Sequence, residues 1–122
     1  MKILVLDDNR LLATVLADHL AARGHEVVVA HDGHLAEVFC QRQRFDLVII
    51  DMVLPEIDGV DLIERLRSKR QQCRVIVITG FPELSEKESD RLQRLGVEAV
   101  IEKPFSFSDV DAVVEGGQPV GP

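Results

Sequence analysis

The sequence predicts an α/β protein built on one doubly wound parallel sheet of five strands, with helices on both faces. Short, nearly continuous runs of Val, Ile and Leu alternate five times with longer amphipathic segments. Strands buried on both faces of a parallel sheet have such continuous runs, and the connecting helices cover the two faces through right-handed crossovers. The 122 residues are enough for one domain with its own core.

The expected strands are rich in Val and Ile, and we place them at residues 2–6, 26–30, 46–50, 74–78 and 98–101. Aromatic residues make up 4% of the chain, and Trp and Tyr are absent. The core is therefore expected to be aliphatic.

The expected helices carry apolar stripes at helical spacing, and we place four of them at residues 9–23, 34–42, 59–69 and 84–95. Gly24 and Gly96 end the first and the fourth. A fifth, short helix begins after Phe105, where Ser106 and Asp109 resemble a capping box. The residues expected to face the core are Leu12, Val15, Leu16 and Leu20 in the first helix, Leu35, Val38 and Phe39 in the second, Leu62, Ile63 and Leu66 in the third, and Phe107, Val110, Val113 and Val114 in the fifth.

Residues 1–115 are expected to form the domain, and residues 116–122, which are rich in Gly and Pro, a flexible tail or linker. The formal net charge of −7 argues against direct binding to nucleic acid or to an anionic membrane, both of which need a basic surface. We expect a cytoplasmic protein, because no signal peptide or bilayer-spanning stretch is visible.

The cysteines and histidines give no sign of a metal or redox centre. Cys40 and Cys73 are expected to be small buried or half-buried residues of a reducing compartment and not a disulfide. His31 and His34 lie close together, but no further zinc ligand accompanies them.

Polar residues follow four of the five expected strands. Because the carboxyl ends of parallel strands meet at one edge of the sheet, where ligands bind in such folds, we expect these residues to lie close together. They are Asp7 and Asp8 after the first strand, Asp51 after the third, Thr79 and Gly80 after the fourth, and Lys103 and Pro104 after the fifth.

This set favours phosphoryl chemistry at a magnesium site. Three neighbouring carboxylates repel one another, and a hard divalent cation such as Mg²⁺ removes that cost. A carboxylate beside the ion can attack phosphorus, while Lys103 and the Thr79 hydroxyl support the developing charge. Each residue alone has an ordinary explanation, such as a helix cap or a solvated acid. Their joint placement at the strand ends favours the chemical interpretation.

Four segments together resemble a response-regulator receiver domain, the CheY-like family with a flavodoxin-like fold. They are LVLDDN at residues 4–9, DLVIIDMVLPEIDG at residues 46–59, VITG at residues 77–80 and EKPF at residues 102–105. The resemblance covers nearly the whole chain. Residues 51–59 are its most specific part, and Pro55 and Gly59 would shape the loop there.

The resemblance implies that Asp51 is the phosphoacceptor. Asp7 and Asp8 would be the acid pair that binds Mg²⁺ together with Asp51, and the backbone carbonyl of Val53 would be a further ligand.

The resemblance also assigns the switch residues. Thr79 would supply the hydroxyl that moves to the phosphoryl group, and the Gly80 amide would donate to the same group. Lys103 would pair with the phosphate, and its bond to Pro104 would be cis. The aromatic residue usual three positions before the lysine is replaced by Val100, so readout by ring rotation is not expected.

A receiver domain implies a two-component system or phosphorelay. The donor would be a sensor histidine kinase, a histidine phosphotransfer protein or a small phosphodonor. The signal would pass to an output domain or partner through the face of the fourth helix, fifth strand and fifth helix, or through a homodimer. The protein would be a switch that phosphorylates and dephosphorylates itself, not an enzyme that turns over an external substrate.

Three alternatives stay open at this point. A phosphohydrolase or phosphotransferase with an aspartyl nucleophile would need a substrate pocket and usually a second domain. A pseudo-receiver would have lost its site, which the intact acids argue against. A nucleotide-binding domain would carry a Gly-rich loop after the first strand, where this sequence has Asp7 and Asp8.

Overall fold

The computed structural model describes residues 1–54, 57–69, 72–80 and 84–116. Its five strands form one parallel sheet in the order β2-β1-β3-β4-β5, which confirms the predicted fold class. The elements in chain order are β1 (Lys2–Leu6), α1 (Arg10–Ala22), β2 (Glu26–Ala30), α2 (Gly33–Arg42), β3 (Leu47–Asp51), α3 (Gly59–Ser68), β4 (Arg74–Thr79), α4 (Glu86–Arg94), β5 (Ala99–Glu102) and α5 (Phe107–Val114).

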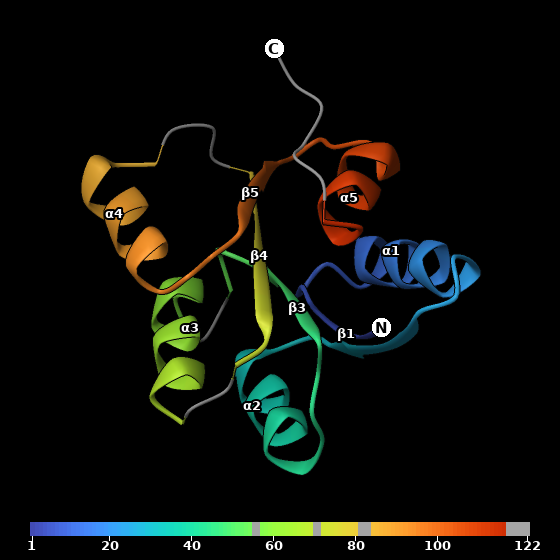
Figure 1. Cartoon of the computed structure of the whole chain (residues 1–122), viewed down its shortest axis with the longest axis horizontal. Coiled ribbons are helices and arrows are strands. Elements are labelled where there is room, and N and C mark those ends of the chain that lie inside the picture. The colour runs from blue at the N-terminus through green and yellow to red at the C-terminus, as the bar shows by residue number, and fades with distance from the viewer. Residues whose placement is uncertain (55–56, 70–71, 81–83, 117–122) are drawn as a thin grey trace.

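The helices cover the sheet in two layers (Figure 1). Helices α1 and α5 lie side by side on one face, where their buried residues join Ile3, Val5 and Ile49 in one apolar cluster. Helices α2, α3 and α4 lie on the other face, around Leu4, Leu6 and further buried strand residues. Successive apolar residues of β1, β2, β3 and β4 therefore pack into opposite clusters, as the two-residue period of a strand requires.

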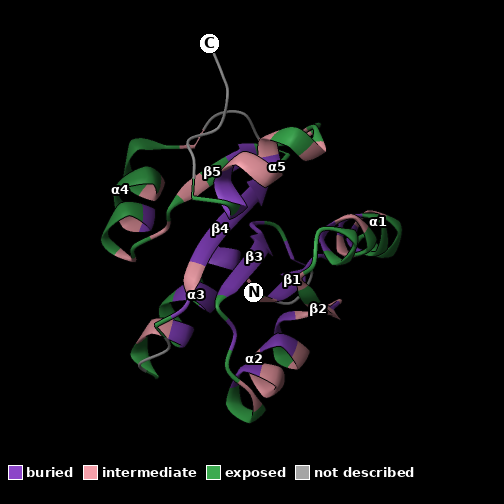
Figure 2. Cartoon of the chain, turned by 45° about the vertical axis from the view of Figure 1, so that its right-hand side comes forward, coloured by how far each residue is buried: buried purple, intermediate pink, exposed green. Residues whose placement is uncertain are grey.

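The central strands are buried on both faces, and the edge strands are not (Figure 2). All five residues of β3 are buried, whereas β2 buries only Ala30 and β5 only Ile101. The expectation of burial on both faces was therefore wrong for β2 and β5. A continuous apolar run does not reveal which strand lies at the edge, because strand order is set by the crossovers.

The predicted boundaries were confirmed for β1 and β2 and shift by one or two residues elsewhere. β3 and β4 extend to include Asp51 and Thr79, so both polar residues lie on the last positions of their strands. Helix α4 begins at Glu86, after Leu84, because Ser85 and Glu88 form a capping box there. The predicted capping box of Ser106 and Asp109 at α5 is confirmed.

The core faces of two helices differ from the prediction. In α1 the buried residues are Ala13, Leu16 and Leu20, while Val15 is 41% exposed and Leu12 is half-buried. In α2 the buried residues are Gly33, Ala36 and Cys40, and the predicted Leu35, Val38 and Phe39 are half-buried. The small residues Ala13, Gly33, Ala36 and Cys40 are among the buried positions, and a stripe drawn through the largest apolar side chains misses them. The predicted core residues of α3 are all buried, and in α5 only Phe107 is half-buried.

Both cysteines are buried and free, as predicted. Burial raises the pKa of the Cys40 thiol to about 11 and also raises that of Cys73, so both stay protonated at neutral pH. None of the helices in the described part of the chain has the length and apolar character needed to cross a bilayer.

Candidate functional site

Three carboxylates meet at the carboxyl edge of the sheet, as the sequence predicted. Oxygen atoms of Asp7, Asp8 and Asp51 all lie within 4.8 Å of one another. Asp7 and Asp51 are buried, whereas Asp8 is exposed. β1 and β3 are neighbours in the sheet, and this pairing brings the two buried acids together.

Lys103 reaches into this cluster from the segment after β5. Its ammonium donates to Asp51 Oδ2 at 3.0 Å and to Asp7 Oδ2 at 3.3 Å. The second oxygen of each acid accepts from a backbone amide two residues further on: Asn9 N to Asp7 Oδ1 at 2.9 Å, and Val53 N to Asp51 Oδ1 at 3.1 Å. Both carboxylates are thus oriented by a local turn on one side and by Lys103 on the other.

The electrostatics of the cluster suit a bound divalent cation. Burial raises the pKa of Asp7, and the charge of Asp51 adds to this against the opposing effects of the Asn9 amide and Lys103. Burial disfavours the charged form of Lys103, but its hydrogen bond to Asp51 and the charges of both acids prevail and raise its pKa. Three carboxylates and one ammonium leave a formal charge of −2 when all are ionised. Hard oxygen ligands with this charge fit Mg²⁺.

The chain after β3 folds back over the end of that strand. Val53 and Asp58 form an antiparallel bridge, and the Gly59 amide donates to the Met52 carbonyl at 2.9 Å. A Cβ atom on residue 59 would lie 2.8 Å from Met52 Cα and 2.9 Å from the Asp51 carbonyl oxygen. Only glycine fits this approach, which agrees with the predicted part of Gly59 in shaping the loop. Asp58 then caps α3 by accepting from Val60 N at 2.7 Å.

The other predicted residues lie at the same edge. Thr79 is buried at the end of β4, and its carbonyl accepts from the Lys103 amide at 2.7 Å. Gly80 follows and is exposed. The Lys103–Pro104 bond is cis, as the resemblance implied. Val53 is 52% exposed beside Asp51. Pro55 and residues 81–83 lie outside the described residues.

His31 is a neighbour of the site that the sequence prediction missed. Its Nδ1 lies 3.5 Å from the backbone carbonyl oxygen of Asp7. The signal was present in the sequence, because His31 directly follows β2 just as the acids follow β1 and β3.

The fold and this edge together define a class of protein. It is a doubly wound α/β domain in which an acidic cluster suited to a metal ion, and a lysine, lie at the carboxyl ends of the strands. Residues 3–115 match the profile of the response regulator receiver domain. The chain belongs to this family and is a receiver domain of two-component signalling.

Proteins with similar sequences support this family assignment. The chain is 31% identical to the alkaline phosphatase synthesis transcriptional regulatory protein PhoP of Bacillus subtilis, over 93% of this chain and 47% of that protein. It is 34% identical to the transcriptional regulatory protein PdtaR of Mycobacterium tuberculosis, over 93% of this chain and 55% of that protein. The chain thus spans about half the length of these relatives.

Two receiver structures match over most of their length. The receiver domain of the Francisella response regulator 1452 superposes with a TM-score of 0.84 at 27% identity, covering 93% of each chain. The response regulator TrrA of Thermotoga maritima, solved in complex with Mg²⁺ and BeF, superposes with a TM-score of 0.80 at 28% identity, covering 93% of this chain and 96% of that one.

Proposed function

We propose that Asp51 accepts a phosphoryl group, in a reaction that requires Mg²⁺, from a histidine kinase, a histidine phosphotransfer protein or a small phosphodonor. The observation that carries this proposal is the position of Lys103, which bonds to both Asp51 and Asp7 within the acidic cluster. A carboxylate held between an amide and an ammonium is oriented for attack before the donor arrives.

The proposed transfer forms one bond and breaks one. An Asp51 oxygen bonds to phosphorus while the bond from phosphorus to the donor's nitrogen or acyl oxygen breaks, and the donor leaves with that electron pair. Lys103 then pairs with a phosphoryl oxygen and stabilises the negative charge on the transferring phosphoryl group. Asp7, Asp8, Asp51 and the Val53 carbonyl would hold Mg²⁺, which neutralises charge on the phosphoryl oxygens when bound.

The switch would follow from the new phosphoryl oxygens. They offer strong charge-assisted acceptors to the Thr79 hydroxyl and the Gly80 amide, which lie at the end of β4. A shift of Thr79 would bias the chain between β4 and α4. We infer a switch of this kind in residues 1–115, and not turnover of an external substrate.

The donor is proposed to dock on the start of α1. Leu11 is 75% exposed there, and Arg10 and Thr14 are exposed beside it. This surface directly follows Asp7 and Asp8 in the chain, so a helical partner resting on it would lie next to the acidic cluster. A large exposed leucine at such a place suits an apolar contact with the partner.

The output is proposed to leave through the face of α4, β5 and α5, to an output domain, a partner or a second copy of the chain. Val100 of β5 is 37% exposed on the sheet edge that α4 and α5 flank. Since valine has no ring to rotate, the signal would travel through α4 itself.

A labelling experiment tests the proposed function. Incubation with acetyl phosphate and Mg²⁺ should phosphorylate the protein, and chelation of the metal should abolish labelling. Asp51→Asn should remove it completely, while Asp18→Asn, a change of an exposed acid on α1, should leave it intact. Labelling of Asp51→Asn at the wild-type rate would refute the assignment.

A second experiment tests docking. Leu11→Asp should slow transfer from the partner kinase and leave labelling by acetyl phosphate unchanged. Equal loss of both reactions would show that the substitution disturbs the fold, and the docking role would then be rejected.

A further inference from the structure

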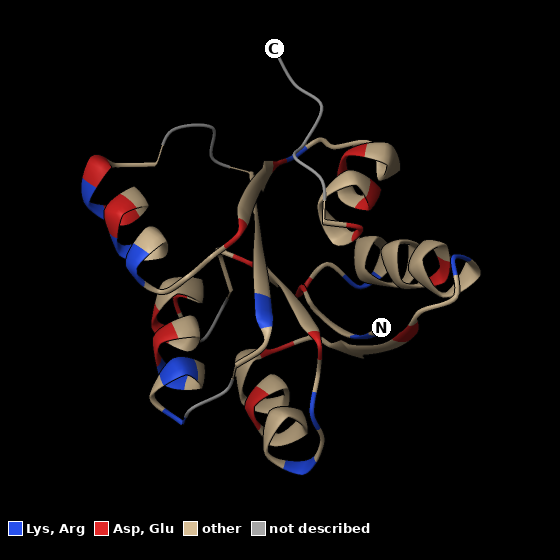
Figure 3. Ribbon diagram, viewed as in Figure 1, with Lys and Arg blue, Asp and Glu red and all other residues tan. Residues whose placement is uncertain are grey.

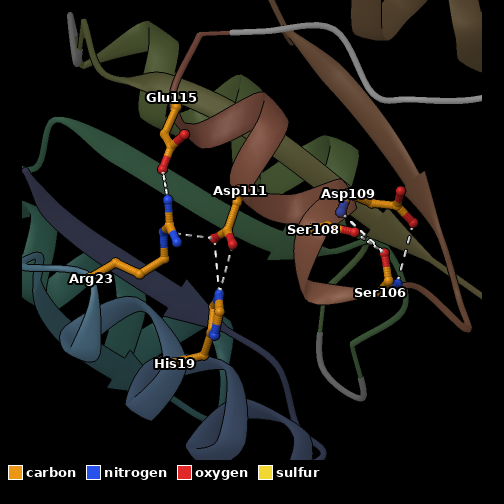
Figure 4. A network of polar contacts seen from close by, with 7 residues as sticks. All are labelled: His19, Arg23, Ser106, Ser108, Asp109, Asp111 and Glu115. Carbon is orange, nitrogen blue, oxygen red and sulfur yellow. Dashed lines mark hydrogen bonds and ion pairs between the residues drawn. The ribbon is translucent and has the colours of Figure 1, made fainter.

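A compact polar cluster joins α1 to α5 (Figure 4). His19 Nε2 lies 2.9 and 3.0 Å from the two carboxylate oxygens of Asp111. Arg23, the C-cap residue of α1, lies with its Nε 3.4 Å from Asp111 and also pairs with Glu115. We call these four residues the α1–α5 clasp.

The clasp is partly shielded from water. The side chains of His19 and Asp111 are 23% and 16% exposed. The His19 ring stacks on Phe107, with ring centroids 4.3 Å apart and planes 17° apart. Phe107 is the first residue of α5, so His19 contacts both the start of this helix and its middle.

The charge of the clasp depends on one proton. Arg23 stays charged, because its bonds to Glu115 and the charge of Asp111 raise its pKa further. His19 is the member of the clasp whose ring can be either neutral or protonated. Protonated, it adds a second cation to Asp111; neutral, it keeps at most one hydrogen bond to that carboxylate.

One further titratable pair lies close to the clasp. His25 contacts the Met1 amine at 3.1 Å, and it interacts electrostatically with Arg23, Asp111 and Glu115. Burial, the amine and Arg23 lower the pKa of His25, so its charge changes at a lower pH than that of an ordinary histidine.

A short segment links the clasp to the acidic cluster. Only three residues separate Lys103, which bonds to Asp51 and Asp7, from Phe107. Phe105 is partly buried and packs against the apolar cluster that contains residues of α1 and α5, and Ser106 caps α5. The segment is therefore anchored along its length. Lys103, which would exchange its carboxylate partners for a phosphoryl oxygen, is therefore connected to Phe107 and His19 by a short segment with its own packing contacts.

We propose that the α1–α5 clasp is a proton-sensitive joint: protonation of His19 and occupancy of the phosphoacceptor site are thermodynamically linked through the segment from Lys103 to Phe107. This inference rests on the proposed function of Asp51. Linkage is reciprocal, so the site must change the proton affinity of His19 by the same factor as protonation changes the affinity of the site.

The test follows the His19 ring by NMR between about pH 5 and pH 8, with and without Mg²⁺ and beryllofluoride, a stable mimic of the phosphoryl group. The midpoint of the His19 titration should move by about 0.3 pH units or more, which is about a twofold change in proton affinity. His34, which is exposed at the start of α2, serves as the internal control and should not respond.

Two variants sharpen the test. Asp111→Asn keeps the shape and a hydrogen-bond acceptor but removes the charge. The change that beryllofluoride causes in the midpoint of the His19 titration should therefore be smaller in this variant. His19→Gln keeps a donor but cannot titrate, and the beryllofluoride affinity should lose the pH dependence that the wild type shows.

The outcomes separate the two proposals. If the Thr79 and Gly80 amides respond to beryllofluoride and the His19 titration does not move, the linkage is wrong and the phosphoacceptor site stands. If these amides do not respond at all, the proposed function fails, and the linkage fails with it.

Discussion

The two helices that flank β5 are attached to the domain in different ways. Helix α5 has eight residues and buries Val110, Val113 and Val114. Its last carbonyls also accept from the Arg74 guanidinium, at 2.9 Å for Val113 and 3.0 Å for Val114. Helix α4 has nine residues and buries only Leu92.

Partly buried Leu84, Leu95 and Val97 pack against the core at the two ends of α4, and polar contacts add to its attachment. Arg91 pairs with Asp61 and Glu64 of α3, and Arg67 Nε donates to the Leu95 carbonyl at 2.9 Å. The first turn of α4 carries Glu86 and Glu88 and its last turn carries Arg91 and Arg94, an arrangement that interacts favourably with the helix dipole but adds no buried area. Figure 3 shows charged residues of both signs along this helix. Exposed ion pairs contribute little stability, and salt screens them.

The comparison indicates which helix can carry a signal. Moving α5 requires exposing three buried valines and breaking the contacts of Arg74 and the clasp. Moving α4 requires changes at one buried leucine, at partly buried apolar residues beside the helix and at surface charges. We therefore expect α4 to shift on phosphorylation while α5 keeps its place.

The largest effect is expected from Leu92→Ala, which removes the one buried side chain of α4. Truncation of a buried leucine costs about 3 kcal/mol, and here the loss should appear first as local opening of α4. Hydrogen exchange of the α4 amides should accelerate by at least about tenfold, with α5 protected as before.

Val113→Ala in α5 is the matched control. Removal of two methyl groups should cost about 1–2 kcal/mol of global stability without selective opening of α5, because Val110 and Val114 remain buried. Selective opening of α5 in this variant would contradict the comparison.

A smaller effect is expected from screening. Raising the salt concentration to about 0.5 M should increase exchange in α4 and leave α5 nearly unchanged, since the Debye length falls below about 5 Å. Arg91→Gln should produce the same increase at low salt and make α4 insensitive to added salt. If added salt still increased hydrogen exchange in α4 of the Arg91→Gln variant, the ion pairs of Arg91 would not be the salt-sensitive contacts that hold α4.

The smallest effect is expected from Val100→Tyr. The site is 37% exposed, so a larger side chain should change stability by less than about 0.5 kcal/mol. If α4 carries the signal by itself, the changes in its amide shifts on adding beryllofluoride should be the same in this variant. A large new response at residue 100 would instead show that an aromatic ring adds to the readout.

The fold and the acidic edge were accessible to sequence reasoning for a common physical reason. Strand–helix alternation fixes a parallel sheet, and a parallel sheet places all strand ends at one edge, so Asp7, Asp51 and Lys103 could be brought together without coordinates. The start of α4 was less accessible, because Leu84 continues an apolar pattern that the Ser85 cap interrupts.

Contacts between distant side chains away from this edge were not accessible. His19 and Asp111 are 92 positions apart, and their pairing depends on how α1 and α5 lie on the sheet. The exposure of Val15 and the edge position of β2 depend on the same packing. Hydrophobic periodicity indicates which side of a helix or strand is apolar, but it does not indicate which neighbouring element that side packs against.

The central claim is that Asp51 is the phosphoacceptor and that the acidic cluster needs Mg²⁺. The most direct measurement is to map the adduct by mass spectrometry after incubation with acetyl phosphate, with and without the metal. The account predicts a single phosphorylated peptide that contains Asp51, formed only when Mg²⁺ is present. A phosphoryl group on any other residue, or equal modification without the metal, would contradict it.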